Sequence, residues 1–460
     1  MKHIRTRYAP SPTGYLHIGG ARTALLSYLY AKHFNGEFII RIEDTDLERN
    51  IKDGEDSQID NLIWLGVIPD ESPRNENKKY GKYRQSEKLN RYQVVVEELI
   101  KNGKAYRAFD TPEELERQKS EKQSLDNFNF HYDPHWLKIT DEEREKRLKN
   151  HQYVVRLKVT PNKIYEWYDL VRENIAVNSN EITDFVIQKQ NGYPTYNFAV
   201  VVDDFDMEIT HVLRGAEHIT NTPKQLAIYD ALNWTPPSFG HLTIITNNEG
   251  KKLSKRDYSI KQFIEDYKNI GYPSIAIFNF LALLGWSDIE SKEIMTKEEI
   301  IKRFDGKRFA KSPTIFNMDK MIWFAKSHMK MMKNDDIIKH LNIPTTTDKQ
   351  WLEVFLNIYK EGVSTFTQFQ ELFDSYQNLS VKSQKERNEI VTFFAQELNQ
   401  KPFSIENIKL AIEKTKQKTN KKGKELFMPL RQAITYKDQG PELATDIWLM
   451  GEKIVKARLK

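Results

Sequence analysis

The sequence predicts a doubly wound α/β fold with a parallel sheet, an α+β insertion, and all-α domains towards the C-terminus. A short strand over residues 4–8 is followed by a loop rich in Pro and Gly, a helix over 21–33 and a buried-type strand over 38–42. This order of strand, loop, helix and strand opens a doubly wound sheet. A highly charged helical stretch begins near residue 110, and no alternating strand pattern follows residue 320.

Local signals predict the later elements. Ser86 can cap a helix that runs to about Asn102, where Gly103 ends it. Thr111 and Thr140 each precede a Glu three positions later, which is the pattern of a capping box. Apolar runs predict strand-rich segments over 153–159 and 174–186, a helix over 221–232, and a strand over 241–246.

Size and composition favour a globular protein with more than one core. The chain has 460 residues, which at roughly 150 residues per domain suggests about three domains. Its 24 Phe, 21 Tyr and 8 Trp argue against disorder. Lys and Arg number 70 and Asp and Glu 65, so the net charge is +5 with His neutral. This mild basicity is compatible with a polyanionic partner without requiring one.

Cysteine is absent, which excludes disulfides, thiolate nucleophiles and metal sites with cysteine ligands. The N-terminal segment has no apolar signal-peptide region, and the most apolar stretch, 274–286, is interrupted by Asn279 and too short to span a bilayer. Residues of catalytic type begin within the first ten positions, so we expect no long targeting extension before them. We therefore expect a cytoplasmic protein without a membrane partner.

Two polar clusters follow the first two predicted strands. One is the loop over residues 9–20, and the other runs from Arg41 to Asp46. In a doubly wound sheet ligands bind beyond the carboxyl ends of the strands. Both clusters are therefore expected at a ligand site.

The first loop has the composition of a phosphate site. Pro10, Pro12 and Gly14 restrict its path, and His17-Ile18-Gly19-Gly20 opens the helix. A helix N-terminus presents free N–H groups and the positive end of the helix dipole, and both favour phosphate. His17 would add a donor for charge that develops on a phosphate in the transition state. A histidine at a helix start is, taken alone, more often a packing residue.

A second, basic loop follows the strand predicted at 241–246. Its sequence is Lys251-Lys252-Leu253-Ser254-Lys255-Arg256. Flexible cations on a loop can close on a triphosphate and release the pyrophosphate leaving group. Such a loop is, on its own, more often an exposed basic turn. The combination of the two loops in one chain is the specific signal.

This combination resembles the class I aminoacyl-tRNA synthetases, whose two motifs are written HIGH and KMSKS. Other segments are similar to the bacterial glutamyl-tRNA synthetases, namely Arg41 to Asp46, Pro194 to Phe198, Val201 to Asp204, Thr210 to Gly215 and Met428 to Arg431. The resemblance runs from about residue 4 to the C-terminus and is weakest over 111–150 and 325–420. It implies a Rossmann-like catalytic sheet followed by helical domains.

The chain departs from the family pattern in its motifs and in a metal site. Gly20 replaces the last His of HIGH, and Leu253 stands where many relatives have Met. Some relatives bind zinc through cysteines near residues 105–110, which hold none here, so no zinc is expected. His131, Asp133 and His135 lack a third strong ligand nearby, so we predict no metal site there.

The resemblance implies an ATP site and a glutamate site. The implied ATP-binding residues are Pro10, Ser11, Pro12, Thr13, Gly14, His17, Gly19, Gly20, Lys252, Leu253, Ser254, Lys255 and Arg256, with His17 and Lys255 as catalytic residues. The implied glutamate-binding residues are Arg7, Ser11, Glu43, Tyr196, Asn197 and Arg214.

The charges of these residues match glutamate. Arg7 and Arg214 can clamp the two carboxylates, and Glu43 can take the ammonium group. Arg214 would favour glutamate over glutamine, because a neutral amide leaves a desolvated guanidinium unpaired. We interpret Asp203 and Asp204 mainly as structural residues.

The implied reaction is ATP-dependent ligation of glutamate to tRNA. The α-carboxylate attacks the α-phosphorus of ATP, and the terminal ribose hydroxyl of tRNA(Glu) then attacks the glutamyl-adenylate. Mg²⁺ would accompany ATP, held chiefly by the phosphates. The sequence leaves open whether tRNA(Gln) is charged as well. The family expectation is a monomer.

Each segment of the chain is expected to serve one part of this reaction. The expected parts are a catalytic domain over 1–109 and 191–240, an insertion for the acceptor end over 110–190, a lysine-loop and tRNA-stem domain over 241–320, and a helical anticodon-binding domain over 321–460. Arg431, within Met428 to Arg431, is the best single candidate for tRNA binding. A lysine run over 414–424 suits tRNA phosphates and equally suits an exposed helical face.

Three other functions fit parts of the pattern. Enzymes that glutamylate a modified tRNA base lack the anticodon domain, against the chain length and the match at 428–431. Nucleotidyltransferases of the same superfamily are shorter and lack the set Arg7, Glu43 and Arg214. Loss of activity in a tRNA-binding paralogue is disfavoured by the intact motif residues His17, Lys255 and Arg256.

Overall fold

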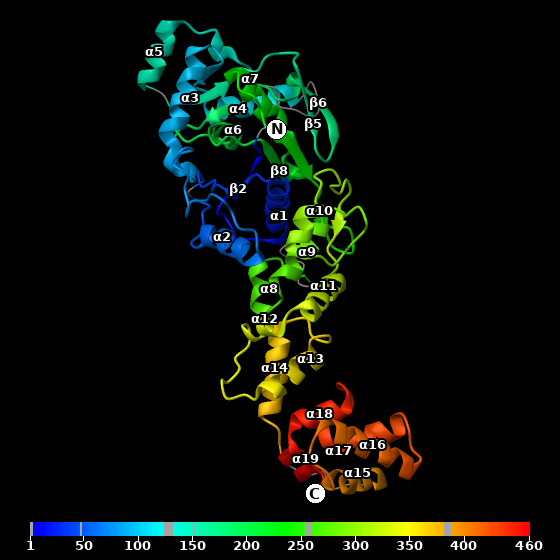
Figure 1. The fold of residues 1–460 in the computed structure, drawn as a ribbon. Helices are drawn as coiled ribbons and strands as arrows, with labels where there is room; N and C mark the ends of the chain where they lie inside the picture. Colours follow the sequence, from blue (N-terminus) through cyan, green and yellow to red (C-terminus); the bar gives the residue numbers. More distant parts are fainter. Residues whose placement is uncertain (1–2, 47, 124–131, 151, 254–259, 381–387) are drawn as a thin grey trace. The chain divides into compact units, whose positions relative to one another are not determined.

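The computed structural model describes residues 3–46, 48–123, 132–150, 152–253, 260–380 and 388–460. The chain divides into two compact units, Met1–Lys268 with Ile277–Met318 and Asn269–Ala276 with Asp319–Lys460. Figure 1 shows that the first unit holds the sheets and that the second is helical.

A six-stranded sheet forms the centre of the N-terminal unit, with strand order β2-β1-β8-β9-β5-β6. Its strands are β1 (Arg5–Tyr8), β2 (Glu37–Ile40), β5 (Ile164–Asp169), β6 (Glu173–Asn178), β8 (His211–Gly215) and β9 (Ser238–Leu242). Neighbours are parallel except β5 and β6, which form an antiparallel hairpin. Blue β2 and green β8 lie in one sheet although they are far apart in the sequence (Figure 1). The predicted doubly wound parallel sheet is confirmed.

Helix α1 (Ile18–His33) connects β1 to β2 and packs against both strands. It begins at Ile18 rather than at the predicted Ala21, because His17 caps it and its first turn includes Gly19 and Gly20. Glycine is a poor helix former, which is why the sequence pattern placed the start too late.

The other helices up to residue 303 are α2 (Gly54–Leu65), α3 (Leu89–Lys101), α6 (Tyr196–Asp206), α7 (Thr222–Leu232), α8 (Ile264–Ile270), α9 (Ser274–Leu283) and α10 (Lys297–Arg303), with 3-10 turns η1 (Gln85–Lys88) and η4 (Ala216–Asn221). Of these helices, α3 and α7 match helices predicted from the sequence, and α10 follows the capped start predicted at Thr296. The helix predicted from Ser86 thus starts as the turn η1. Gly103 follows α3 with φ +66°, in the left-handed region that favours glycine.

A second, three-stranded sheet lies in the segment predicted as the insertion. Its strands are β3 (Ala105–Ala108), β4 (Val154–Leu157) and β7 (Val186–Gln188), and between β3 and β4 run α4 (Pro112–Gln123), η2 (His135–Leu137) and α5 (Asp141–Asn150). The same segment also supplies β5, β6 and the turn η3 (Ser179–Glu181). The residues predicted as the insertion therefore contribute strands to both sheets, and the predicted domain limits stay a prediction.

Four neighbouring strands of the main sheet, β2, β1, β8 and β9, are parallel, so their carboxyl ends lie at the same edge. β1 is in register with β2, with Tyr8 opposite Ile40, and β8 with β9, with Arg214 opposite His241. The loops after these strands therefore meet beyond one edge of the sheet. Beyond β9 the protein forms the short strand β10 (Ile245–Thr246), which pairs with β11 (Thr314–Ile315).

The described residues of the C-terminal unit beyond Asp319 contain helices and no strand. They are α11 (Met318–Met331), α12 (Asn334–Ile338), α13 (Lys349–Tyr359), α14 (Phe366–Gln377), α15 (Glu389–Asn399), α16 (Ile405–Thr419), α17 (Lys424–Thr435), α18 (Leu443–Met450) and α19 (Glu452–Arg458). One apolar core gathers around Phe355 and Phe369, and another around Leu430 and Ile447. Across the described parts of the chain, no helix combines the length and the apolar character needed to cross a membrane.

Candidate active site

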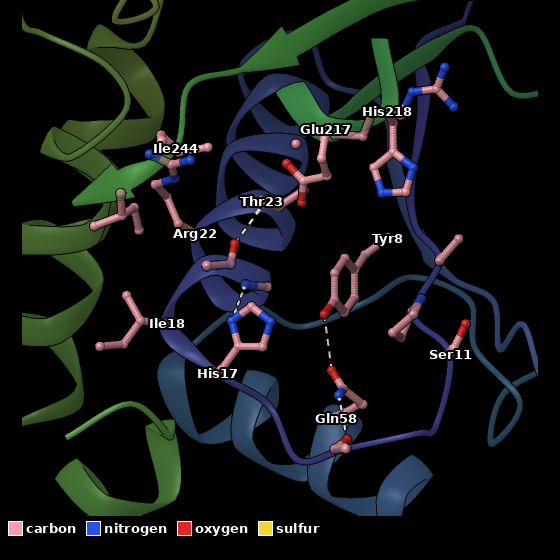
Figure 2. Close-up of a pocket in the computed structure, with 18 of the residues that line it drawn as sticks. Tyr8, Ser11, His17, Ile18, Arg22, Thr23, Gln58, Glu217, His218 and Ile244 are labelled. Atoms are coloured by element: carbon pink, nitrogen blue, oxygen red, sulfur yellow. Dashed lines mark hydrogen bonds between the residues drawn. The ribbon is translucent and has the colours of Figure 1, made fainter. Parts of the chain in front are cut away.

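A cavity of ≈ 660 Å³ opens where the loops after β1, β2, β8 and β9 meet. The predicted site residues that line it are Arg7, Pro10, Ser11, Thr13, Gly14, His17, Gly19, Gly20, Glu43, Tyr196, Arg214, Lys252 and Leu253. Figure 2 shows Ser11 and His17 on either side of this hollow. The structure thus brings the predicted ATP and glutamate residues around one space, and their individual roles stay predictions.

The other predicted residues do not line this cavity or are not described. Pro12 lines a separate, more open hollow beside Asp44. Asn197 instead donates from Nδ2 to Asn221 Oδ1 (3.4 Å) and accepts from Gln225 Nε2 (3.0 Å). The predictions for Ser254, Lys255 and Arg256 fall outside the described residues.

His17 is oriented by the helix that it caps. Its Nδ1 accepts a hydrogen bond from the backbone N–H of Gly20 (3.2 Å). A neutral ring that accepts at Nδ1 carries its proton on Nε2, so the second nitrogen can donate. A Cβ on Gly19 would lie only 3.0 Å from His17 Cε1, so glycine leaves the ring its place.

Gln58 of α2 braces the first loop from below. Tyr8 Oη donates to Gln58 Oε1 (3.0 Å), and Gln58 Nε2 donates to the carbonyl of Gly14 (3.0 Å), as the dashed lines in Figure 2 show. Neither Tyr8 nor Gln58 was predicted as a site residue. No local motif marks Gln58, because its contact with the loop arises only from tertiary packing.

The basic loop is anchored to the first loop on its C-terminal side. Ile18 donates its N–H to the Gln262 carbonyl (2.8 Å), and Ile264 donates to the Leu16 carbonyl (3.0 Å). Residues 252–253 and 262–263, which flank the undescribed segment 254–259, all line the cavity. The two motif-bearing segments are therefore joined by backbone hydrogen bonds at the mouth of the site.

A buried ion network lies beside the cavity. Asp204 accepts from Arg41 Nη1 (2.8 Å) and from Arg7 Nε (3.2 Å), and Arg41 Nη2 donates to Glu43 Oε1 (3.2 Å). Burial works to raise the pKa of Asp204, but Arg7 and Arg41 hold it below its usual value. Burial raises the pKa of Glu43 to about 7, against the pull of Arg41 and Arg7.

The neighbouring Asp203 is occupied by structural partners. It accepts from Gln85 Nε2 (2.8 Å) and Tyr92 Oη (2.9 Å) and pairs with Lys88 Nζ (2.7 Å). This geometry agrees with the interpretation of Asp203 and Asp204 as structural residues.

Arg214 is buried among neutral acceptors. It donates from Nη2 to Thr222 Oγ1 (2.8 Å), from Nη1 to Gln225 Oε1 (2.9 Å) and from Nε to His241 Nε2 (3.1 Å). Within the described residues it forms no ion pair with a carboxylate, unlike Arg7, which pairs with Asp204. An uncompensated guanidinium at a cavity wall suits an anionic ligand.

Besides Tyr8 and Gln58, the cavity residues that sequence reasoning missed include Arg22, Glu217 and His218. Arg22 is buried on α1 and donates to the Leu284 carbonyl (3.3 Å) and to the Thr243 carbonyl. His218 contacts Tyr196 Oη through Nδ1 (3.2 Å), and burial lowers its pKa to about 4. Their positions directly after the His-Ile-Gly-Gly and Arg-Gly segments were the available signal.

Arg431 lies in the C-terminal unit and is engaged within the protein. Its guanidinium donates to Asp446 Oδ2 (3.3 Å) and to the Pro441 carbonyl (2.5 Å). Only 11% of its side chain is exposed. Its role in tRNA binding stays a prediction.

The described residues contain no group of three or more His, Asp or Glu side chains arranged to hold a metal ion. No metal site was predicted at His131, Asp133 and His135. His135 Nδ1 donates to the backbone carbonyl of Asp133 (3.1 Å), and His131 falls outside the described residues.

Comparison with known proteins matches both parts of the chain to family models. Residues 3–323 match the catalytic domain of class I tRNA synthetases (E and Q), and residues 323–460 match an anticodon binding domain. Together these models span nearly the whole chain.

Individual relatives are similar over their full length. The chain is 58% identical to the glutamate–tRNA ligase of Metamycoplasma arthritidis and 55% identical to that of Mycoplasmopsis agalactiae, covering 100% of this chain and 99% of each relative. A crystal structure of a glutamate tRNA ligase from Elizabethkingia meningosepticum, in complex with its amino acid, superposes with a TM-score of 0.89 at 32% identity, covering 100% of this chain and 98% of that one. The chain that folds these two loops around one cavity therefore belongs to the class I tRNA synthetases of the E and Q type.

Proposed function

We propose that the protein is a glutamate–tRNA ligase. It activates L-glutamate with ATP and transfers it to the 3′-terminal ribose of tRNA(Glu). The observation that carries this proposal is the single cavity lined by Arg7, Glu43, Arg214 and the His17 loop. The similarity to glutamate–tRNA ligases over the full chain supports it independently.

In the first step an oxygen of the glutamate α-carboxylate attacks the α-phosphorus of ATP, and pyrophosphate leaves. Arg7 and Arg214 receive the carboxylates, and Glu43 receives the ammonium group. His17, with its proton on Nε2, donates to the phosphate oxygens as negative charge develops. Lys255, on the second loop, stabilises the same negative charge on the phosphate oxygens. Mg²⁺ supplies further charge neutralisation when it arrives with ATP, chiefly as a phosphate complex.

In the second step the terminal ribose hydroxyl of tRNA attacks the glutamyl carbonyl carbon. The bond to AMP breaks, the hydroxyl proton is lost, and glutamate becomes esterified to the tRNA. No side-chain nucleophile is needed. Catalysis here consists of positioning and electrostatic stabilisation.

The remaining assignments follow from the same function. The protein acts as a cytoplasmic monomer, the 110–190 segment holds the acceptor end of the tRNA, and the helical residues from 321 onward read the anticodon. We propose that the enzyme charges tRNA(Glu), with tRNA(Gln) as the second candidate substrate.

Pyrophosphate exchange with glutamate, ATP and tRNA tests the proposal. Exchange that depends on glutamate is the expected result, and no exchange with either glutamate or glutamine overturns it. Charging purified tRNA(Glu) and tRNA(Gln) separately with labelled glutamate then defines the tRNA range.

A further inference from the structure

We propose that Asp169 and His241 are positioning residues for glutamate recognition: Asp169 fixes the tautomer of His241, and His241 fixes the guanidinium of Arg214. The inference rests on the proposed function, because it assigns a purpose to the glutamate-binding role of Arg214. Neither Asp169 nor His241 lines the cavity, so both act through Arg214.

The three residues lie on adjacent strands of the main sheet. Arg214 of β8 and His241 of β9 are register partners, and Asp169 ends β5, which pairs with β9. All three are buried, with His241 and Asp169 fully enclosed. The order β8-β9-β5 therefore lines up a buried chain Asp169–His241–Arg214 that leads to the cavity wall.

The hydrogen bonds define one tautomer of His241. Arginine has only donors, so His241 Nε2 must accept from Arg214 Nε (3.1 Å). The Thr222 hydroxyl, 3.0 Å from Nε2, then donates to the same nitrogen. The ring proton is therefore on Nδ1 and is donated to Asp169 Oδ2. Burial lowers the pKa of His241, a shift in the direction that favours the neutral ring.

Asp169 is held so that only Oδ2 faces the ring. Its Oδ1 accepts three backbone N–H groups, from Val171, Arg172 and His241, each at 3.0 Å. Burial works to raise the pKa of Asp169, but the hydrogen bonds from His241 outweigh it and bring the pKa to about 2. Oδ2 accepts from His241 Nδ1 and, at 3.4 Å, from Trp167 Nε1.

The hydrogen bonds from Asp169 through His241 orient Arg214 without placing a carboxylate directly on its guanidinium. Thr222, Gln225 and His241 take one N–H from each of its three nitrogens. A carboxylate paired directly with Arg214 would compete with the substrate for the remaining N–H groups. Placing the negative charge one residue away, behind a neutral imidazole, orients the fork while leaving its charge available to glutamate.

The isosteric change Asp169→Asn should reverse which nitrogen of the His241 ring carries the proton. The three backbone N–H groups hold the amide oxygen at the Oδ1 position, so the amide NH₂ faces His241 Nδ1. The ring must then accept at Nδ1 and carry its proton on Nε2. That N–H would meet Arg214 Nε–H, donor against donor, and the guanidinium would be displaced.

The test measures pyrophosphate exchange by the full chain in the presence of tRNA, with glutamate and ATP varied in turn. Asp169→Asn should raise the KM for glutamate by roughly ten- to a hundred-fold and leave the KM for ATP unchanged. KM does not depend on the fraction of chains that fold, so partial misfolding does not obscure this split. Equal changes in both KM values, or no change in either, would overturn the proposal.

Asp70→Asn is the matched control. The Asp70 carboxylate also accepts from a backbone N–H, that of Phe38 (2.7 Å), and from Lys32 Nζ (2.6 Å), but near the opposite, amino end of β2. It should leave both KM values as in the wild type. A wild type without glutamate-dependent exchange contradicts the proposed function. An active wild type in which Asp169→Asn behaves like Asp70→Asn contradicts only the chain Asp169–His241–Arg214.

Two further measurements separate positioning from general structure. His241→Phe removes the ring through which Asp169 acts, so the double variant with Asp169→Asn should show the same glutamate KM as His241→Phe alone; multiplied effects would mean independent roles. Nitrogen-15 NMR of the His241 ring should show the proton on Nδ1 in the wild type and on Nε2 in Asp169→Asn. An unchanged tautomer in that variant would also refute the proposal.

Discussion

Two arginines line the same cavity with different electrostatic partners. Arg7 pairs with the buried Asp204, whereas Arg214 is held by a hydroxyl, an amide and an imidazole. Residue type alone does not distinguish them, and both were assigned as carboxylate clamps from the sequence. Their surroundings indicate that Arg214 carries the larger uncompensated charge towards the ligand.

Glu43 gives the site a dependence on pH. Burial raises its pKa to about 7, while Arg41 and Arg7 oppose this rise. In the role proposed for Glu43 only its carboxylate can hold the substrate ammonium group, and protonation removes that carboxylate as the pH falls below about 7. We therefore expect kcat/KM for glutamate to fall by about tenfold per pH unit on the acid side. The profile of kcat/KM for ATP is the control, and a shared decline, or a flat glutamate profile, would contradict this role for Glu43.

Substitution of Arg431 distinguishes a structural role from the predicted role in tRNA binding. Arg431→Ala would leave the buried Asp446 with Tyr376 Oη (2.6 Å) but without its cation. We expect the free energy of unfolding to fall by roughly 1–3 kcal/mol in urea titrations. Replacement of the exposed Lys453 by Ala in α19 should cost less than about 0.5 kcal/mol. A higher KM for tRNA with unchanged stability would instead identify Arg431 as a tRNA ligand.

At the scale of elements, the N-terminus of α1 is the most constrained part of the site. His17 caps it, Gln58 of α2 braces the loop before it, and Gln262 and Ile264 hold the loop by backbone hydrogen bonds. Hydrogen bonds therefore connect the helix, the first loop and the segment that begins at Gln262.

The position of the Tyr8 hydroxyl leaves no room for a side chain at Gly20. A Cβ at Gly20 would lie 2.6 Å from Tyr8 Oη, which Gln58 holds in place. We expect Gly20→Ala to lower the free energy of unfolding by roughly 1–3 kcal/mol and to raise the KM for ATP. Removing the hydroxyl with Tyr8→Phe in the same chain should recover most of the stability. Gly14→Ala, whose Cβ meets nothing within 4 Å, is the stability control. A double variant no better than Gly20→Ala alone would rule out the clash.

At the scale of the whole molecule, the charge of the protein is compatible with a polyanionic partner. The net charge is +5, and the lysine run over 414–424 adds a local excess on helix α16 and the residues after it. Some of these lysines already pair with acids, as Lys414 does with Glu397 (2.7 Å). Exposed ion pairs of this kind are weak, so they can yield to phosphate.

The tRNA interaction should therefore depend on salt. We expect the KM for tRNA to rise at least about tenfold between about 50 and 200 mM salt, because phosphate contacts release counterions. The KM for glutamate, measured in the same assays at saturating tRNA, should change far less because its site is buried. Equal salt dependence of both values would argue against an electrostatic tRNA surface.

The sequence predicted that the segments bearing the candidate site residues gather at one place because they follow strands of one parallel sheet, and most of their named residues line the same cavity. Pro10 to Gly20, Arg41 to Glu43 and Arg214 each come directly after or at the end of a strand, and parallel strands bring such segments to one edge. The start of α1 was predicted too late, since Gly19 and Gly20 are weak helix formers and the cap by His17 decided the boundary.

What the sequence determined by itself was the chemistry of the cavity wall: the glycine-containing loop before α1, the two arginines and the acidic Glu43. What only the tertiary structure decided was the partner of each of these groups. Between β5 and β9 the sequence runs through β6, β7, α6, β8 and α7, yet the pairing of β5 with β9 places Asp169 beside His241 and so behind Arg214. Local periodicity carries no information about which distant strands pair, because pairing depends on packing and burial over the whole sheet.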